Sequence, residues 1–202
     1  SRLLVGPWTH TAIGSAESFG DIDFGPTAAV DIPGEHLRWY DQRLKGVTTG
    51  IDDEPPVRLF VMGENRWRGE QAWPLARTRY TKFYLHSQGR ANSLYGDGLL
   101  SLAAPADEAV DRFTYDPADP VPTLGGQSMF ITNTGPKDRR PFERRDDVLV
   151  YSTLPLGEAV EVTGPITLTL YAASSAPDTD FTATLVDVHP NGKAIHLTEG
   201  IV

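Results

Sequence analysis

The chain has 202 residues, no cysteine and a formal net charge of −9 at pH 7. The absence of cysteine excludes disulfides, thiolate catalysis and zinc–thiolate sites. The acidic balance argues against a nucleic-acid surface, which needs clustered lysine and arginine, and no apolar run approaches the roughly 18 residues of a transmembrane helix. We therefore expect a globular protein with neither a nucleic-acid nor a membrane partner, and we take the cytoplasm as its working location.

The first ten residues contain the main candidate for catalysis. An apolar run at residues 3–5 ends in Gly6-Pro7 and is followed by His10, which is typical of a short buried strand. In open α/β sheets, ligands bind just outside the carboxyl ends of the strands, where a histidine is suited to act as a general base. The alternative is a histidine that only hydrogen-bonds a neighbour. Neither a nucleophile nor an orienting carboxylate precedes His10, so we expect a piece of a larger hydrolase-like protein.

A helix is predicted after a loop at residues 11–26. Asp31 can cap its N-terminus and Pro33 suits its first turn, while Lys45-Gly46 is favourable at its end. A strand at 57–63 follows a polar connector, and residues 64–79 show no clear period. Strand, helix and strand in this order are typical of an α/β unit. The face expected to pack consists of Leu37, Tyr40 and Leu44.

From residue 80 the pattern changes to short β-type runs separated by turn residues, with no convincing helix among them. Such a pattern indicates an antiparallel sandwich or jelly roll. Asn191-Gly192 predicts a hairpin turn, and the last strand reaches the end of the chain without a closing turn, so we expect an incomplete sandwich. The runs are 81–85, 111–115, 128–132, 148–152, 160–162, 166–172, 181–188 and 194–197.

Other candidate sites are weaker. Ser18 only loosely matches the G-x-S-x-G nucleophile motif, lacks its strand and helix, and follows the histidine instead of preceding it. Three aspartates, Asp178, Asp180 and Asp187, fit turn caps better than a calcium site. No metal site is predicted. The remaining histidines considered, none with a partner at metal-ligand spacing and each expected at the surface or in a supporting role, are His36, His189 and His196.

Five stretches together carry a resemblance to a known family. They are GPWTH at 6–10, VRLFVMG at 57–63, YDPADPVP at 115–122 with Gly125-Gly126, DVLVYS at 147–152 and DTDFTA at 178–183. In this order and spacing, the chain resembles the X-Pro dipeptidyl-peptidase and cocaine-esterase-like acyl hydrolases over nearly its whole length.

The resemblance implies a fold, a reaction and a set of residues. Residues 1–77 would be the last strand–helix–strand segment of an α/β-hydrolase domain, and 78–202 most of a C-terminal jelly roll, which makes the class mainly β. His10 matches the catalytic histidine of a Ser-His-Asp triad, whose other members and oxyanion-hole donors would lie upstream. Met129 and Phe130 match positions that wall the acyl pocket. No cofactor is implied, since the triad needs none.

Substrate and assembly stay open at this stage. The resemblance allows X-Pro peptides, small acyl esters or β-lactams as substrates, and a homodimer as the assembly. The isolated chain is expected to be inactive, because the histidine alone supplies no nucleophile. The alternative function is a non-catalytic jelly-roll module for binding or assembly. Such a module would have no need of the Gly6–His10 stretch or of the α/β order before residue 63.

Overall fold

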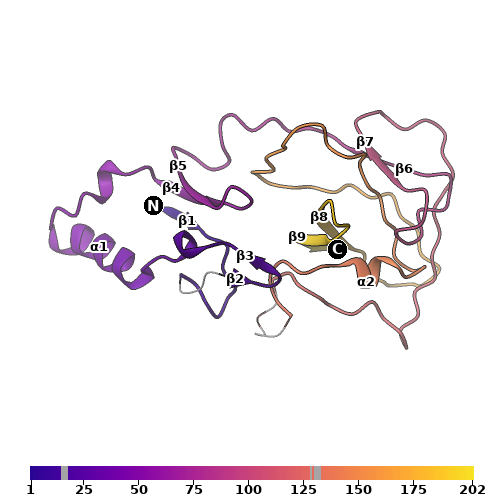
Figure 1. The fold of residues 1–202 in the computed structure, drawn as a ribbon, viewed down its shortest axis with the longest axis horizontal. Coiled ribbons are helices and arrows are strands. Elements are labelled where there is room, and N and C mark those ends of the chain that lie inside the picture. The colour runs from indigo at the N-terminus through magenta and orange to yellow at the C-terminus, as the bar shows by residue number, and fades with distance from the viewer. Residues whose placement is uncertain (15–17, 128, 130–132) are drawn as a thin grey trace.

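The computed structural model describes residues 1–14, 18–127, 129 and 133–202. Figure 1 shows an elongated molecule with a long helix at one end and short paired strands toward the other. Strands outnumber helices, so the predicted mainly-β class is confirmed. The strands are β1 (Leu3–Val5), β2 (Ser18–Phe19), β3 (Ile22–Asp23), β4 (Val57–Val61), β5 (Arg66–Glu70), β6 (Tyr84–His86), β7 (Leu99–Ser101), β8 (Thr182–Val188) and β9 (Ala194–Ile201). The α-helices are α1 (Ile32–Lys45) and α2 (Arg140–Glu143), and the 3-10 turns are η1 (Pro26–Ala28) and η2 (Ile51–Asp53).

The first part of the chain forms a strand–helix–strand unit, as predicted. β1 and β4 pair in parallel, with Leu3 opposite Val57 and Val5 opposite Leu59, and a parallel pair needs a crossover of the kind that α1 supplies. β5 then pairs antiparallel with β4, giving the order β1-β4-β5. The sequence does not predict β5, because its residues lack apolar alternation. A tight turn between β4 and β5, in which Asn65 has a φ of 50°, supplies the pairing instead.

The ends of α1 agree with the prediction and its packed face does not. The Asp31 carboxylate accepts from the N–H of Gly34 at 3.1 Å, and Gly46 ends the helix in the left-handed conformation. The expected apolar face is exposed at Leu37, Tyr40 and Leu44. That expectation is wrong for the described chain, because α1 is held instead through its charged residues. Glu35 accepts from Arg58 at 2.9 Å, and Arg38 pairs with Glu54.

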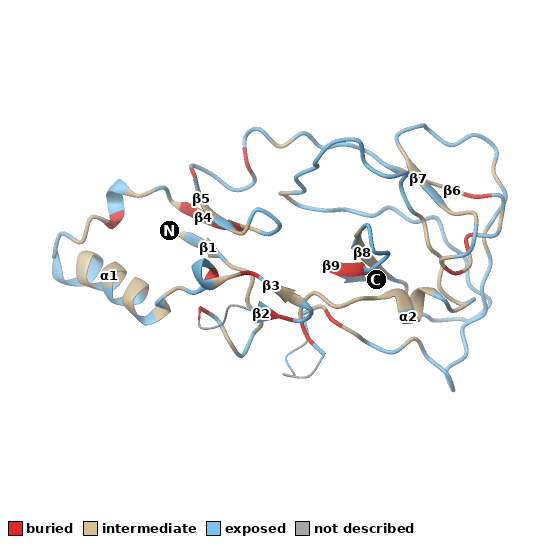
Figure 2. Cartoon of the chain, viewed as in Figure 1, coloured by how far each residue is buried: buried red, intermediate tan, exposed pale blue. Residues whose placement is uncertain are grey.

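The main core lies under the turn that follows β1. Figure 2 shows buried residues on β4 and β5, on the segments around β2 and β3, and on β9. One cluster joins four buried residues to four partly buried ones, so the loop between β1 and α1 is part of the core although it shows no sequence period. Its members are Phe19, Phe24, Ala28 and Phe60, with Trp8, Ala12, Ile22 and Trp67 packed against them. A smaller cluster consists of Val57, Leu59 and Leu75.

The second part of the chain, residues 78–202, contains fewer paired strands than predicted. β8 and β9 pair antiparallel, and the predicted turn at Asn191-Gly192 joins them, with Gly192 at a φ of 78°. β6 lies near the expected run at 81–85 and pairs with β7, which the sequence does not predict. Helix α2 is also unpredicted and is a single turn.

Four of the predicted strands do not form. Residues 111–115, 160–162 and 166–172 have no strand assignment, and 148–152 makes only isolated bridges, at Leu149 and Ser152. Alternating side chains stabilise a strand only when a neighbouring strand accepts its hydrogen bonds. In the described ranges no ladder reaches residues 160–172, and Ile166, Leu168 and Leu170 stay about half exposed. The predicted run at 128–132 lies outside the described residues except for Met129.

A cap variant tests the local argument for α1. We expect Asp31→Ala to lower the free energy of unfolding by about 1 kcal/mol, because it removes the acceptor for the Gly34 N–H. Asp31→Asn keeps an acceptor and is expected to cost much less. Urea denaturation of the two variants measures the difference, and equal losses would contradict the capping role.

Candidate active site

His10 lies in an exposed turn just beyond the carboxyl end of β1. Because β1 and β4 are parallel, the carboxyl ends of both strands meet at this edge of the sheet, which is where ligands bind in α/β proteins. The turn is closed by the N–H of Ala12, which donates to the carbonyl of Thr9 at 3.2 Å. The sequence-based placement of His10 at a strand end therefore agrees with the structure, while its catalytic role stays a prediction.

Two tryptophans connect the chain before this turn and strand β5 to η1. The Trp8 indole donates to the carbonyl of Ala28 at 2.9 Å, and the Trp67 indole donates to that of Thr27 at 2.7 Å. Their rings pack against each other with centroids 5.6 Å apart. Both hydrogen bonds end on η1, so the chain just before His10 is fixed to β5 and to η1 together.

The β2–β3 hairpin extends from this core toward the second part of the chain. Figure 1 shows it between the β1-β4-β5 sheet and the β8–β9 pair. At its turn, Gly20 has a φ of 59°, and a Cβ placed there would collide with the carbonyl oxygen of Pro136. The next residue, Asp21, forms an ion pair with Lys137 at 2.8 Å. The Lys137 ammonium holds the pKa of the Asp21 carboxyl below its usual range.

A loop of the second part meets the hairpin at this point. Gly126 and Gly135 exchange two backbone hydrogen bonds of 2.9 and 3.0 Å, which close the base of a loop spanning residues 126–135. Met129 lies on this loop and is 67% exposed, so its side chain is free to contact a bound molecule. Phe130, the second predicted pocket residue, lies outside the described residues.

His196 on β9 packs against the base of the same loop, at Gly126. It is only 3% exposed, so of the two positions expected from the sequence, at the surface or in a supporting role, the surface one does not apply. Its ring lies so close to Gly126 that an added Cβ would be 3.0 Å from the ring carbon Cε1. Burial lowers the pKa of the His196 imidazole, which favours the neutral ring. A small residue at Gly126 is therefore required by packing, and no local sequence signal shows it.

A second polar contact joins the two parts at β5. Arg68 donates to both carboxylate oxygens of Glu161, at 2.8 and 2.6 Å, and also pairs with Glu70 at 2.6 Å. Glu70 in turn accepts from Arg77 at 2.8 Å. The Arg68 guanidinium lowers the pKa of Glu161 from its ordinary 4.5 to about 2.

A serine–histidine–carboxylate set also occurs away from the His10 turn. His86 Nε2 lies 3.1 Å from the Ser101 hydroxyl, and His86 Nδ1 lies 2.7 Å from Glu108. However, Nε2 also faces the carbonyl oxygen of Ala103 at 3.0 Å. The Ala103 carbonyl thus competes with the Ser101 hydroxyl for the same ring nitrogen, which is not the arrangement of a base aimed at a serine proton. This set is structural.

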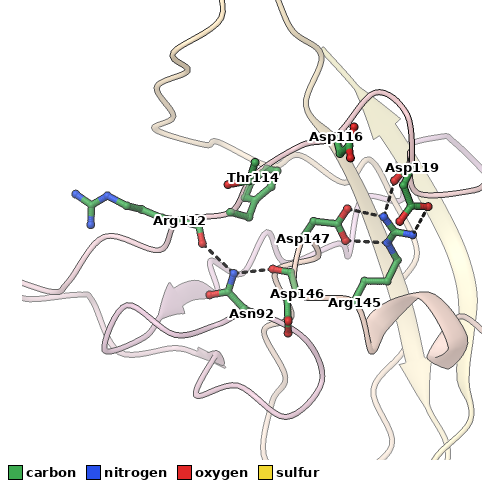
Figure 3. Close-up of a pocket in the computed structure, with 9 residues that line it drawn as sticks. Asn92, Arg112, Thr114, Asp116, Asp119, Arg145, Asp146 and Asp147 are labelled. Atoms are coloured by element: carbon green, nitrogen blue, oxygen red, sulfur yellow. Dashed lines mark hydrogen bonds and ion pairs between the residues drawn. The ribbon is translucent and has the colours of Figure 1, made fainter.

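The groove in Figure 3 is lined by charged side chains that largely satisfy one another. Arg145 binds Asp147 through two hydrogen bonds of 2.8 and 2.7 Å and contacts Asp119 as well. The Asn92 amide bridges the carbonyls of Arg112 and Asp146, each at 2.8 Å. In the described part of the chain, no group of three or more histidines or carboxylates could hold a metal ion, and no helix is long and apolar enough to cross a membrane.

Most of the chain matches a known protein family. Residues 49–202 match the family described as the X-Pro dipeptidyl-peptidase C-terminal non-catalytic domain. The chain belongs to the X-Pro dipeptidyl-peptidase and cocaine-esterase-like family. This confirms the family predicted from the sequence and its fold class. The match begins after His10, so the candidate histidine lies outside the part that the family description calls non-catalytic.

Individual relatives extend over the whole chain. It is 48% identical to the cocaine esterase of Rhodococcus sp. (strain MB1 Bresler), with 100% of this chain and 36% of the esterase covered. A protein of Mycobacterium bovis named as a serine esterase is 32% identical, with 99% and 30% covered. The crystal structure of an aminopeptidase from a marine sediment Thaumarchaeota archaeon superposes with a TM-score of 0.74 at 27% identity, over 99% of this chain and 34% of that one. The chain thus spans about a third of these relatives.

A pH series tests the contact at β5. A carboxylate with a lowered pKa contributes stability above its ordinary pKa, and loses it as the pH falls through the folded value. The Glu161 contribution is therefore lost between pH 4.5 and about 2. We expect Glu161→Gln to lower Tm by about 1–3 °C near neutral pH, and this difference to vanish at about pH 2. Glu158→Gln, at an exposed glutamate of the same segment, is the control and should show no such pH dependence.

Removing the hydroxyl of the structural set should leave chemistry unaffected. We expect Ser101→Ala to leave any ester turnover of the full-length protein within about twofold, because the Ala103 carbonyl competes for the ring nitrogen that faces the hydroxyl. Turnover of a chromogenic ester by the full-length protein measures this. A loss of more than about tenfold would show that the set takes part in catalysis.

Proposed function

We propose that this chain supplies the histidine of a Ser-His-Asp triad in a serine hydrolase that cleaves ester or amide bonds. The observation that carries the proposal is the position of His10, exposed at the edge where the parallel strands β1 and β4 end. Membership in a family whose relatives include esterases supports it. The serine, the aspartate and the oxyanion-hole donors come from a preceding part of the natural protein.

His10 acts as general base and then as general acid. It takes the proton of the serine hydroxyl as the oxygen attacks the substrate carbonyl, and then gives this proton to the leaving alcohol or amine. In the second half of the cycle it activates a water molecule that hydrolyses the acyl-enzyme. The rigid support of the turn by Trp8 suits this role, because proton transfer requires the base within hydrogen-bond reach of the nucleophile.

The second part of the chain shapes the pocket for the acyl group. The loop at 126–135 leaves the second part beside the hairpin that follows His10, and Met129 on it is exposed. In this proposal, Met129 and Phe130 contact the acyl group of a small ester or an X-Pro peptide. Residues 78–202 otherwise act structurally, by shaping the cleft and contributing to a homodimer. The reaction requires no cofactor, and the cytoplasm is the proposed location.

Replacement of the histidine in the full-length protein tests the proposal. We expect His10→Ala to reduce kcat by at least about 10³-fold, because the serine loses its base. A fluorophosphonate probe should label the unmodified protein. His36→Ala, which changes an exposed histidine on α1, is the matched control and should keep full turnover.

The opposite results would end the proposal. A His10→Ala protein with unchanged turnover would exclude the histidine from the triad. A full-length protein that neither hydrolyses esters nor reacts with the probe would favour a non-catalytic binding module. The isolated 202-residue chain should show no turnover above that of free imidazole, and turnover that survives serine-directed inhibitors would contradict the placement of the nucleophile upstream.

A further inference from the structure

Asp21 connects the hairpin after His10 to the segment that leaves the loop at 126–135. Its carboxylate accepts from the Lys137 ammonium at 2.8 Å and from the N–H of Asp138 at 3.1 Å. Its own N–H donates to the carbonyl of Pro136 at 2.8 Å. One residue thus contacts three consecutive positions, which fixes both the distance and the direction between the two segments.

On one side, the hairpin is firmly attached to the turn of His10. Phe19 and Ile22 flank the tip at Gly20-Asp21 and belong to the main core cluster of Phe24 and Phe60, in which Phe19 is 6% exposed. Trp8 and Ala12, which lie two positions before and two positions after His10, pack against the same cluster. Because cores are close-packed, a displacement of the tip is transmitted to these neighbours.

On the other side, the segment is firmly attached to the base of the loop. The N–H of Gly125 donates to the carbonyl of Asn133 at 2.7 Å, and Gly126 is bonded twice to Gly135. Pro136 follows directly. A shift of Pro136 relative to the hairpin therefore moves the loop base, and with it the point from which Met129 projects.

We propose that Asp21 is a positioning residue that sets the spacing between His10 and the loop of Met129, and through it the size of the acyl group that the site accepts. The inference rests on the proposed function and deepens it by assigning a determinant of substrate selectivity. In the proposed function the loop of Met129 contacts the acyl group, and a large acyl group would make more of this contact than an acetyl group. Loosening this spacing should therefore affect large acyl groups much more than small ones.

The hairpin contains a matched control at Asp23. Its carboxylate accepts from the N–H of Gly25 at 2.8 Å, a contact within the same segment. Asp23→Asn removes the same charge from the same hairpin, but it leaves the contact with Lys137 and Asp138 in place. Any difference between the two asparagine variants therefore reports the link between the segments.

The experiment compares two esters with the full-length protein. The values of kcat and KM for p-nitrophenyl acetate and p-nitrophenyl benzoate give the selectivity ratio of kcat/KM. We expect Asp21→Asn to lower the benzoate-to-acetate ratio by about fivefold, the upper range for a partly exposed ion pair. Asp21→Ala should lower it further, because it also removes the acceptor for the Asp138 N–H. Asp23→Asn should leave the ratio unchanged.

Three outcomes would count against the inference or its basis. An unchanged ratio in both Asp21 variants, with acetate still hydrolysed, overturns the inference and leaves the proposed function intact. An equal loss for both esters, together with a lower Tm, shows that Asp21 only supports folding and also overturns it. If the unmodified protein hydrolyses neither ester, the proposed function itself fails.

Discussion

The aromatic cluster beneath the turn of His10 is the constraint on which the first part of the structure depends. Phe60 on β4 lies between Phe24 and Trp67, with ring centroids 6.0 and 5.4 Å away. These rings join the loop after β1 to β4 and β5, and their burial stabilises this part of the chain. The indoles of Trp8 and Trp67 also donate to main-chain carbonyls, which restricts how these two rings can be oriented in the cluster.

Charged and polar contacts join this part to the rest of the chain. Asp21 with Lys137 lies at the hairpin, and Arg68 with Glu161 lies at β5. Beside the second pair, the Thr78 hydroxyl donates to the carbonyl of residue 163 at 3.3 Å. Partly exposed ion pairs contribute little energy. The two parallel bonds from Arg68 to Glu161 also define orientation, since an arginine fork donates to a carboxylate in few geometries. The apolar cluster thus provides stability, and the polar contacts provide relative placement.

Local signals in the sequence predict the features that depend on local physics. The cap at Asp31, the stop at Gly46 and the turn at Asn191-Gly192 follow from backbone preferences that act within a few residues. The position of His10 at a strand end also follows from such signals. In contrast, β5, the hairpin at β2–β3 and the role of Asp21 depend on partners far away, and Lys137 is 116 positions from Asp21. The helix face at Leu37 and Leu44 shows the reverse error, because periodicity predicts an apolar face but not what covers it.

The contact between Asp21 and Pro136 has a consequence for how sequences of this fold can diverge. The bond runs from a main-chain N–H to a main-chain carbonyl, so no side-chain change at either position removes it, except proline at position 21. The steric restriction falls instead on Gly20, where any Cβ would collide with the Pro136 carbonyl. Divergent sequences can therefore retune the charges across this junction while keeping its backbone geometry, provided that the position before Asp21 stays glycine.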